Sequence, residues 1–188
     1  RSLREAIKSK TGHVSQQKST YSQCDTTQAH WHTAGFLGAK VIALPTRRVA
    51  FMRRFGPYGK ETCQQTHQDL LTSLPARTPL QPAGMLCVYW DPPDVTAEQH
   101  CRTDVGFELS EGEQVSRHIA VQTIAAGNYL VCKCAAWGDQ VDNTWALAFA
   151  WMRTKGLMKS DKPCYEMYYN ETNAAHDYYV YDICIPLN

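Results

Sequence analysis

The sequence lacks several features that would assign it at once to a large functional class. It has no excess of charge of one sign, because 19 Lys and Arg stand against 18 Asp and Glu among 188 residues. A surface that binds nucleic acid through its phosphates is basic, so this balance argues against one. The apolar run at Ala146–Met152 is far too short to cross a bilayer. No charged-then-apolar leader opens the chain, and we expect a cytoplasmic protein with no membrane segment.

Motifs for catalysis by a bound nucleophile or metal are also missing. The sequence contains no nucleophile elbow and no Ser-His-Asp set. Four zinc ligands normally come as two close pairs, whereas Cys132-x-Cys134 stands alone, so we expect neither a metal nor a cofactor. The eight cysteines lie at positions 24, 63, 87, 101, 132, 134, 164 and 184. Four of them fall in strand-like runs, which favours buried free thiols over disulfides or metal ligands.

Phenylalanine is scarce among the aromatic residues. The chain has 5 Phe against 10 Tyr and 5 Trp. Each Tyr or Trp offers a flat apolar face together with a hydrogen-bonding edge. This composition suits an aromatic binding pocket, and it suits equally an ordinary core with partly hydrated edges.

Two regions of different composition are visible. Residues 11–34 are rich in Ser, Thr and Gln and have no apolar period. We interpret residues 1–36 as an N-terminal tail or linker. Residues 37–188 are the predicted globular domain.

The globular region contains an internal repeat. Two segments, about residues 39–110 and 117–187, each read as a strand, a helix with one apolar stripe, and two further strands. Asp104 and Asp182 occupy corresponding places in the two closing strands. We therefore predict an α+β fold built from two strand-helix-strand-strand modules in a pseudo-twofold repeat, with a central ligand groove between them.

Glu166 is the one charged residue in an otherwise apolar and aromatic strand, Cys164–Tyr169. Because side chains alternate along a strand, Glu166 and Tyr168 share a face. Alignment through the repeat places Glu166 opposite Cys87 and Tyr168 opposite Tyr89 of the first module. A slip of one residue in the register would reverse this assignment.

The opposite face of the first-module strand carries Leu86 and Val88. These two side chains suit packing under a helix. We therefore expect the face that contains Glu166 to look into the space between the two modules.

A carboxylate is costly to bury unpaired, and two interpretations of Glu166 follow. In the first, it pairs with a basic side chain (Arg53, Arg54 or Lys133) or reaches solvent. In the second, it lies at the bottom of an aromatic pocket. Such a pocket suits a lipophilic cation, which the rings attract and the carboxylate neutralises.

A series of short motifs follows in order over about residues 39–187. They are Leu44-Pro45, Arg48-Val49-Ala50, Phe55-Gly56-Pro57-Tyr58, Tyr89-Trp90-Asp91-Pro92-Pro93, Arg102-Thr103-Asp104-Val105-Gly106, Ala126-Gly127 with Tyr129, Pro163-Cys164-Tyr165-Glu166-Met167-Tyr168, and Ile185-Pro186. Each motif is short, and their order is what carries the likeness. The chain thereby resembles the GyrI-like family, the effector-binding domains of AraC-type and related multidrug-responsive regulators, which also occur as stand-alone proteins.

The resemblance implies two strand-helix-strand-strand modules (SHS2 modules) around a groove, in agreement with the repeat. It also implies a pocket for hydrophobic, often cationic molecules, with a central Glu in a Glu-x-Tyr strand. The aromatic count and the helix phase add two tryptophans to the residues that the resemblance supplies. The predicted ligand-binding residues are Glu166, Tyr168, Tyr89, Trp90, Trp137 and Trp145.

Residues 1–23 faintly resemble the end of an AraC-type DNA-binding domain, as though a regulator had been fused to this domain or had lost its front. No complete helix-turn-helix is present. We therefore expect no direct nucleic-acid binding by this chain alone.

Three functions follow from these features. The first is a sensor or sequestering domain for hydrophobic, cationic small molecules. The second is a hydrolase of strained, cyclopropane-type genotoxins, which some members of the family resemble, with Glu166 and Tyr168 in the acid–base role. The third is a gyrase-interacting protein, which the family name implies. We favour binding, since an aromatic pocket supplies affinity without further machinery.

Overall fold

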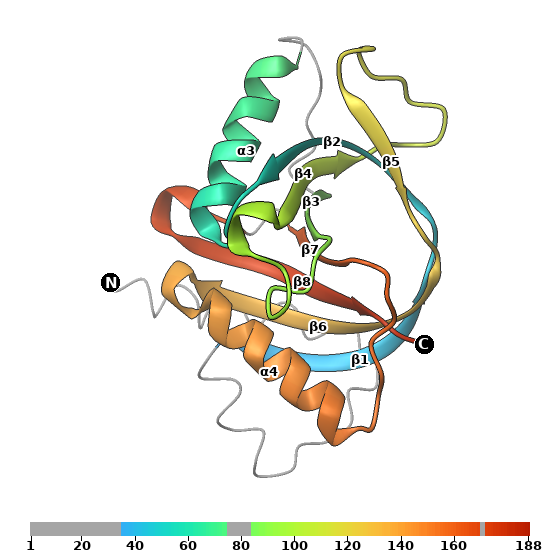
Figure 1. Cartoon of the computed structure of the whole chain (residues 1–188), viewed down its shortest axis with the longest axis vertical. Helices are drawn as coiled ribbons and strands as arrows, with labels where there is room; N and C mark the ends of the chain where they lie inside the picture. Colours follow the sequence, from blue (N-terminus) through green and yellow to red (C-terminus); the bar gives the residue numbers. More distant parts are fainter. Residues whose placement is uncertain (1–34, 75–83, 170–171) are drawn as a thin grey trace, which may run out of the picture.

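The computed structural model describes residues 35–74, 84–169 and 172–188 of the chain (Figure 1). Strands and helices both occur, which confirms the α+β class. The strands are β1 (Phe36–Leu44), β2 (Arg47–Phe55), β3 (Met85–Tyr89), β4 (Arg102–Glu108), β5 (Ala120–Ile124), β6 (Gly127–Trp137), β7 (Cys164–Tyr168) and β8 (Tyr178–Pro186). The helices are α3 (Lys60–Ser73) and α4 (Val141–Thr154), with short 3-10 turns η2 (Glu98–His100), η3 (Gly138–Gln140) and η4 (Ala174–His176).

The strands form one antiparallel sheet of order β1-β6-β8-β7-β3-β4-β2-β5. The strand pair β3 and β7 lies at its centre. Glycine is required in the neighbouring strand β4, because a Cβ on Gly106 would lie 2.2 Å from the carbonyl oxygen of Ala50 in β2. The backbones of β2 and β4 therefore approach each other closely at this point.

Two strands that the sequence did not reveal, β1 and β5, extend the sheet at its edges. Each pairs with the far half of the chain: β1 adds to β6, and β5 adds to β2. Only Pro45 and Thr46 separate β1 from β2, although these strands lie toward opposite ends of the strand order. The sheet must therefore curl, and Figure 1 shows β1 and β2 following one arc around it.

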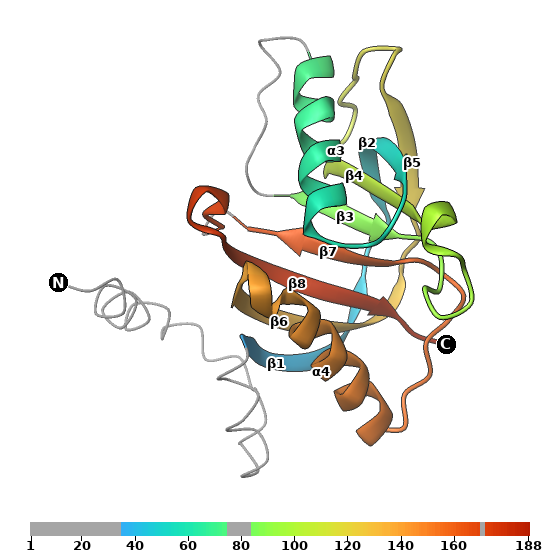
Figure 2. The ribbon, with the colours of Figure 1, turned by 60° about the vertical axis from the view of Figure 1, so that its left-hand side comes forward.

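Both helices cover the same face of the sheet, α3 over β2 and β4 and α4 over β1 and β6 (Figure 2). Helix α3 buries Leu70 against Ala50 of β2. Helix α4 buries Ala148 and Met152, and it ends where Gly156 adopts a φ of 64°, a left-handed conformation typical of a helix C-terminus.

The curl buries the opposite face as well. Leu86 and Val88 pack there with Tyr165 and Met167, away from both helices. The expectation that Leu86 and Val88 pack under a helix was therefore wrong. The grouping of side chains by face was right, and the helices lie on the face that contains Glu166.

Most of residues 1–36, the predicted tail with its likeness to a DNA-binding domain, lie outside the described residues. The first described strand begins at Phe36, next to the predicted boundary at residue 37. Within the described part of the chain, neither helix is long and apolar enough to cross a membrane.

Candidate functional site

Glu166 lies in the middle of the central strand β7, directly opposite Cys87 of β3. It is 1% exposed. Because side chains alternate along both strands, Tyr89 and Tyr168 lie on the same face. The predicted pairing of Glu166 with Cys87 is therefore correct, and Glu166 points from the centre of the sheet toward the two helices. The predicted pairing of Tyr168 with Tyr89 was wrong: because the two strands are antiparallel, Tyr168 lies opposite Met85 and Tyr89 lies opposite Cys164.

Three side chains donate hydrogen bonds to the Glu166 carboxylate. Trp145 Nε1 of α4 donates to Oε1 at 2.6 Å. The hydroxyls of Tyr89 and Tyr168 each donate to Oε2 at 2.8 Å. Four of the predicted residues, from β3, β7 and α4, thus meet at one carboxylate.

No basic side chain pairs with Glu166 in the described ranges. Arg53 is paired with Asp104, and Arg54 is paired with Asp69. Lys133 lies opposite Asp182 in the register of β6 and β8. The interpretation in which Glu166 meets one of these cations, or reaches solvent, is therefore wrong.

Burial raises the pKa of Glu166 above its ordinary value. The hydrogen bonds from Trp145, Tyr168 and Tyr89 oppose this effect because they stabilise the charged form. Burial likewise raises the pKa values of the Tyr89 and Tyr168 hydroxyls, so both phenols keep their protons near neutral pH. Within the described ranges, Glu166 therefore has three neutral hydrogen-bond donors and no basic partner.

A cavity of about 1220 Å³ opens between α3, α4 and the sheet, and Glu166 is part of its wall. Its apolar and aromatic lining includes Tyr58, Leu70, Leu71, Met85, Tyr89, Phe107, Val141, Trp145, Phe149, Tyr168 and Tyr179. Its charged lining is mostly acidic: Asp91, Asp94, Asp142, Asp161 and Glu166 against Lys60 and Lys159. The space therefore suits a molecule that is apolar and positively charged.

Aromatic rings pack edge-to-face around the carboxylate. The Tyr89 ring lies 5.7 Å from Trp145 and 5.0 Å from Tyr58, and both contacts are T-shaped. Trp145 also lies 5.9 Å from Phe149, one turn further along α4. These contacts fix the orientation of the rings that surround Glu166.

The two remaining predicted residues lie apart from this cluster. The indole N–H of Trp90 donates to Asp104 Oδ2 at 2.6 Å, and the guanidinium groups of Arg53 and Arg102 lie over its ring. Trp90 also contributes to the cavity lining. Trp137 is 37% exposed, packs on Tyr178 and does not line the cavity.

Sequence reasoning missed three lining residues near Glu166. Tyr58 lies in the loop before α3, where its hydroxyl bonds the backbone of Asp91 in both directions. Phe149 follows Trp145 by four positions, a spacing that places both on one helix face. Cys63 of α3 lies with its Sγ 3.5 Å from the Tyr89 hydroxyl.

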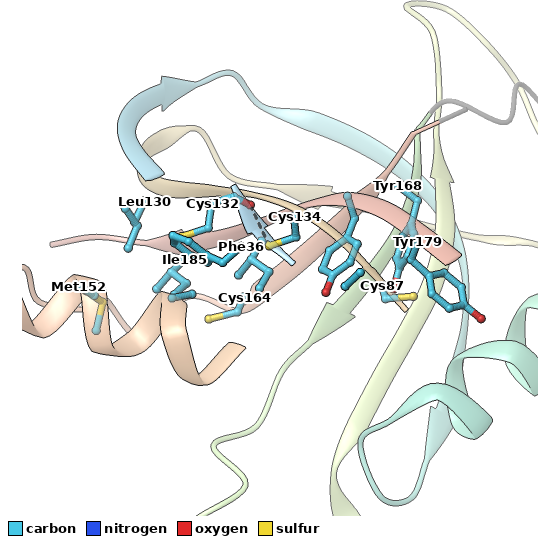
Figure 3. Packing of buried hydrophobic residues seen from close by; sticks show 14 of the residues in the cluster. Phe36, Cys87, Leu130, Cys132, Cys134, Met152, Cys164, Tyr168, Tyr179 and Ile185 are labelled. Atoms are coloured by element: carbon cyan, nitrogen blue, oxygen red, sulfur yellow. Dashed lines mark hydrogen bonds between the residues drawn. The ribbon is translucent and has the colours of Figure 1, made fainter. Parts of the chain in front are cut away.

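Thiols are abundant in the core, and all those described are free. All of them except Cys63 are buried, which agrees with the expectation of buried free thiols. Figure 3 shows Cys87, Cys132, Cys134 and Cys164 among the buried side chains of one hydrophobic cluster. Among the residues that the structure describes, no group of three Cys, His, Asp or Glu is arranged to hold a metal ion.

The chain was compared with known families and proteins. The family model described as the GyrI-like small molecule binding domain matches residues 40–188. A DNA gyrase inhibitor of Yersinia enterocolitica is 27% identical over 149 residues, which cover 77% of this chain and 93% of that protein. The DNA gyrase inhibitor of Escherichia coli K12 is 27% identical over 140 residues, which cover 71% of this chain and 85% of that protein.

Solved structures share the fold at low sequence identity. The C-terminal domain of EcmrR superposes with a TM-score of 0.62 at 16% identity, covering 81% of this chain and 98% of that chain. SAV2435 bound to tetraphenylphosphonium superposes with a TM-score of 0.55 at 14% identity, covering 81% of this chain and 94% of that chain. These likenesses show the fold alone. The ligand of the present chain has to be inferred from its own residues.

Proposed function

The chain belongs to the GyrI-like small-molecule-binding family, and from that premise we propose that its cavity binds hydrophobic cations, with Glu166 as the countercharge. In this proposal Tyr89, Tyr168 and Trp145 orient the carboxylate, and their rings contact the ligand. Trp90 lies at the edge of the site. The protein acts as a sensor or sequestering domain for such molecules.

The observation that carries the proposal is the charge of the site. Glu166 has three neutral donors and no basic partner among the described residues. Because desolvation penalises its ionised form, a bound cation would relieve that penalty. Asp142 and Asp161 add negative charge to the lining. Aromatic faces attract the same kind of ligand through their quadrupoles.

The strand order supports a pseudo-twofold relation between the two halves. Each half contains a strand-helix-strand-strand run that is preceded by one more strand, β1 or β5, and the halves meet at the antiparallel pair β3 and β7. In this arrangement Cys87 and Glu166 are equivalent positions next to the axis. The repeat would thus create one groove in which, of these two equivalent positions, only the one in the second half carries an ionisable carboxyl group.

Binding of tetraphenylphosphonium to the wild type and to Glu166→Gln tests this proposal. The amide keeps the shape of the side chain and removes its charge, so we expect affinity to fall about 10- to 100-fold. Triphenylphosphine oxide, which is aromatic and neutral, is the matched ligand and should bind both proteins within about twofold. Equal affinity of the cation for both proteins, measured by calorimetry, would reject Glu166 as the countercharge.

Hydrolysis is a second candidate, favoured by the same carboxylate. A Glu with a raised pKa beside two phenols is placed for proton transfer to or from a bound molecule. Incubation with a strained cyclopropane-containing electrophile tests it. Turnover that is lost in Glu166→Gln would support hydrolysis, whereas stable binding without product would support binding alone.

A role in gyrase inhibition is the third candidate, and the names of the similar proteins from Yersinia and Escherichia support it. A DNA supercoiling assay with purified gyrase tests this role directly. Unchanged supercoiling at a large excess of the protein would dismiss it.

A further inference from the structure

Two thiols meet at the wall of the cavity, from different elements. Cys63 lies in α3 and is half-buried, and Cys87 lies in β3 and is 1% exposed. The neighbouring Cys63 side chain is the largest cause of the raised pKa of the Cys87 thiol, and both residues line the cavity. Cys132 and Cys134, which lie two positions apart in β6, do not line it. The first two cysteines therefore form a thiol pair that is open to a ligand.

The thiol pair adjoins the Glu166 carboxylate. Cys63 Sγ lies 3.5 Å from the Tyr89 hydroxyl, which donates its proton to Glu166 Oε2 at 2.8 Å. A phenol has a single proton, so the thiol of Cys63 must donate to the phenol oxygen. Thiol, phenol and carboxylate thus form a directed chain of hydrogen bonds, and aromatic rings flank it.

The chemistry of this pair selects a particular class of ligand. Thiolates prefer soft partners. The described residues supply no group of three metal ligands, so a soft centre held here by two sulfurs must bring its own third substituent. An aryl group is the substituent that suits the aromatic wall formed by Tyr89, Trp145 and Phe149.

We propose that Cys63 and Cys87 form a covalent capture site for aryl compounds with a soft trivalent centre, of which trivalent arylarsenicals are the representative class. In water phenylarsine oxide is present as its hydrate, which has two As–OH groups. Two As–O bonds break and two As–S bonds form, while the two thiol protons leave with the hydroxyl groups as two molecules of water. The arsenic stays trivalent, so no oxidant or reductant is needed.

The capture site would give the cavity a covalent function in addition to the proposed reversible binding of cations. Capture depends on the two sulfurs, whereas cation binding depends on the Glu166 charge. Tetraphenylphosphonium would occupy the same space, so we expect it to slow the capture of the arsenical. The two activities can be measured separately on the wild-type protein, and either can fail without the other.

Titration of the reduced full-length chain with phenylarsine oxide tests the proposal. We expect one arsenical per chain by intact mass, with the loss of two titratable thiols, and peptide mapping should place the bridge at Cys63 and Cys87. Competition with 1,2-ethanedithiol measures how tightly the arsenical is held. Cys63→Ser and Cys87→Ala should each weaken retention by about 100-fold, because the second bond is no longer intramolecular.

The double variant Cys132→Ser/Cys134→Ser is the matched control, and it should retain the arsenical as the wild type does. Cys63→Ser changes a half-buried side chain, so it keeps the test valid if Cys87→Ala does not fold. An adduct of one thiol per arsenic, a bridge at Cys132 and Cys134 or through Cys24, or wild-type retention in Cys63→Ser would each overturn the proposal.

Discussion

Two buried carboxylates on opposite faces of the sheet are treated differently by their surroundings. Asp104 of β4 is fully buried, and Arg53 binds both of its oxygens, at 2.6 and 2.8 Å, while Trp90 donates a third hydrogen bond. Glu166 of β7 also has three hydrogen bonds, but all of its donors are neutral. The Asp104 carboxylate is neutralised by an arginine, whereas Glu166 has no basic partner among the described residues.

The comparison separates a carboxylate that stabilises the fold from one that is available to a ligand. Around Asp104 the charge, the hydrogen bonds and the aromatic stacking are all satisfied within the chain. Around Glu166 the hydrogen bonds are satisfied and the charge is not, and an open cavity adjoins it. A buried acid is thus a candidate binding residue when its countercharge is missing.

The largest expected change in stability comes from Asp104→Asn. The amide leaves the Arg53 guanidinium without a countercharge, and Arg53 is only partly exposed. We expect the free energy of unfolding to fall by about 2–3 kcal/mol, less than for a fully buried pair because water reaches Arg53. Urea unfolding measures this loss, and a change close to zero would show that the two carboxylates do not differ in the way described.

Glu166→Gln should raise the free energy of unfolding near neutral pH, the opposite of the change expected for Asp104→Asn. The folded-state pKa of Glu166 is raised, so the folded state binds more protons than the unfolded state above pH about 4.3. The contribution of this group to stability is therefore present at low pH and is lost as pH rises through the folded-state pKa. We expect Gln to equal the wild type in acid and to exceed it in stability near neutral pH. Urea unfolding of both proteins across this pH range measures the difference. A wild type whose free energy of unfolding increases relative to that of the variant as pH rises would contradict this.

The sequence predicted the central site because alternation and the repeat act over short distances. The register of Glu166 with Cys87, the common face of Tyr89 and Tyr168, and the contribution of Trp145 from the helix all follow from periods of 2 and 3.6 residues. The direct pairing of Tyr168 with Tyr89 was wrong, because the repeat alignment ignores that β3 and β7 run antiparallel.

The sequence could not show which face of β3 and β7 carries the helices. Every residue of β7 is buried, because the curled sheet covers one face and the helices cover the other. The curl depends on β1 and β5, whose pairing with the far half of the chain is a long-range property. Trp137 illustrates the same limit, since its contact with Tyr178 depends on how two distant strands end.

The smallest expected effects compare two of the predicted tryptophans, one that lines the cavity and one that does not. Trp145→Phe keeps a ring in the cavity and removes the hydrogen bond to Glu166 Oε1, so the carboxylate should ionise less readily. We expect tetraphenylphosphonium affinity to fall about fivefold, as for the loss of one hydrogen bond. Trp137→Phe, away from the cavity, should leave affinity unchanged. Equal losses of affinity in both variants would show that Trp145 has no specific role in binding.

The most direct measurement is the titration of Glu166 itself. With the side-chain carboxyl carbon of glutamate labelled with carbon-13, NMR can follow its ionisation in the free protein and in the presence of tetraphenylphosphonium. If the bound cation supplies the missing countercharge, the pKa of Glu166 lies above its ordinary value in the free protein and falls when the cation binds. A pKa that is unchanged by saturating cation would contradict the account.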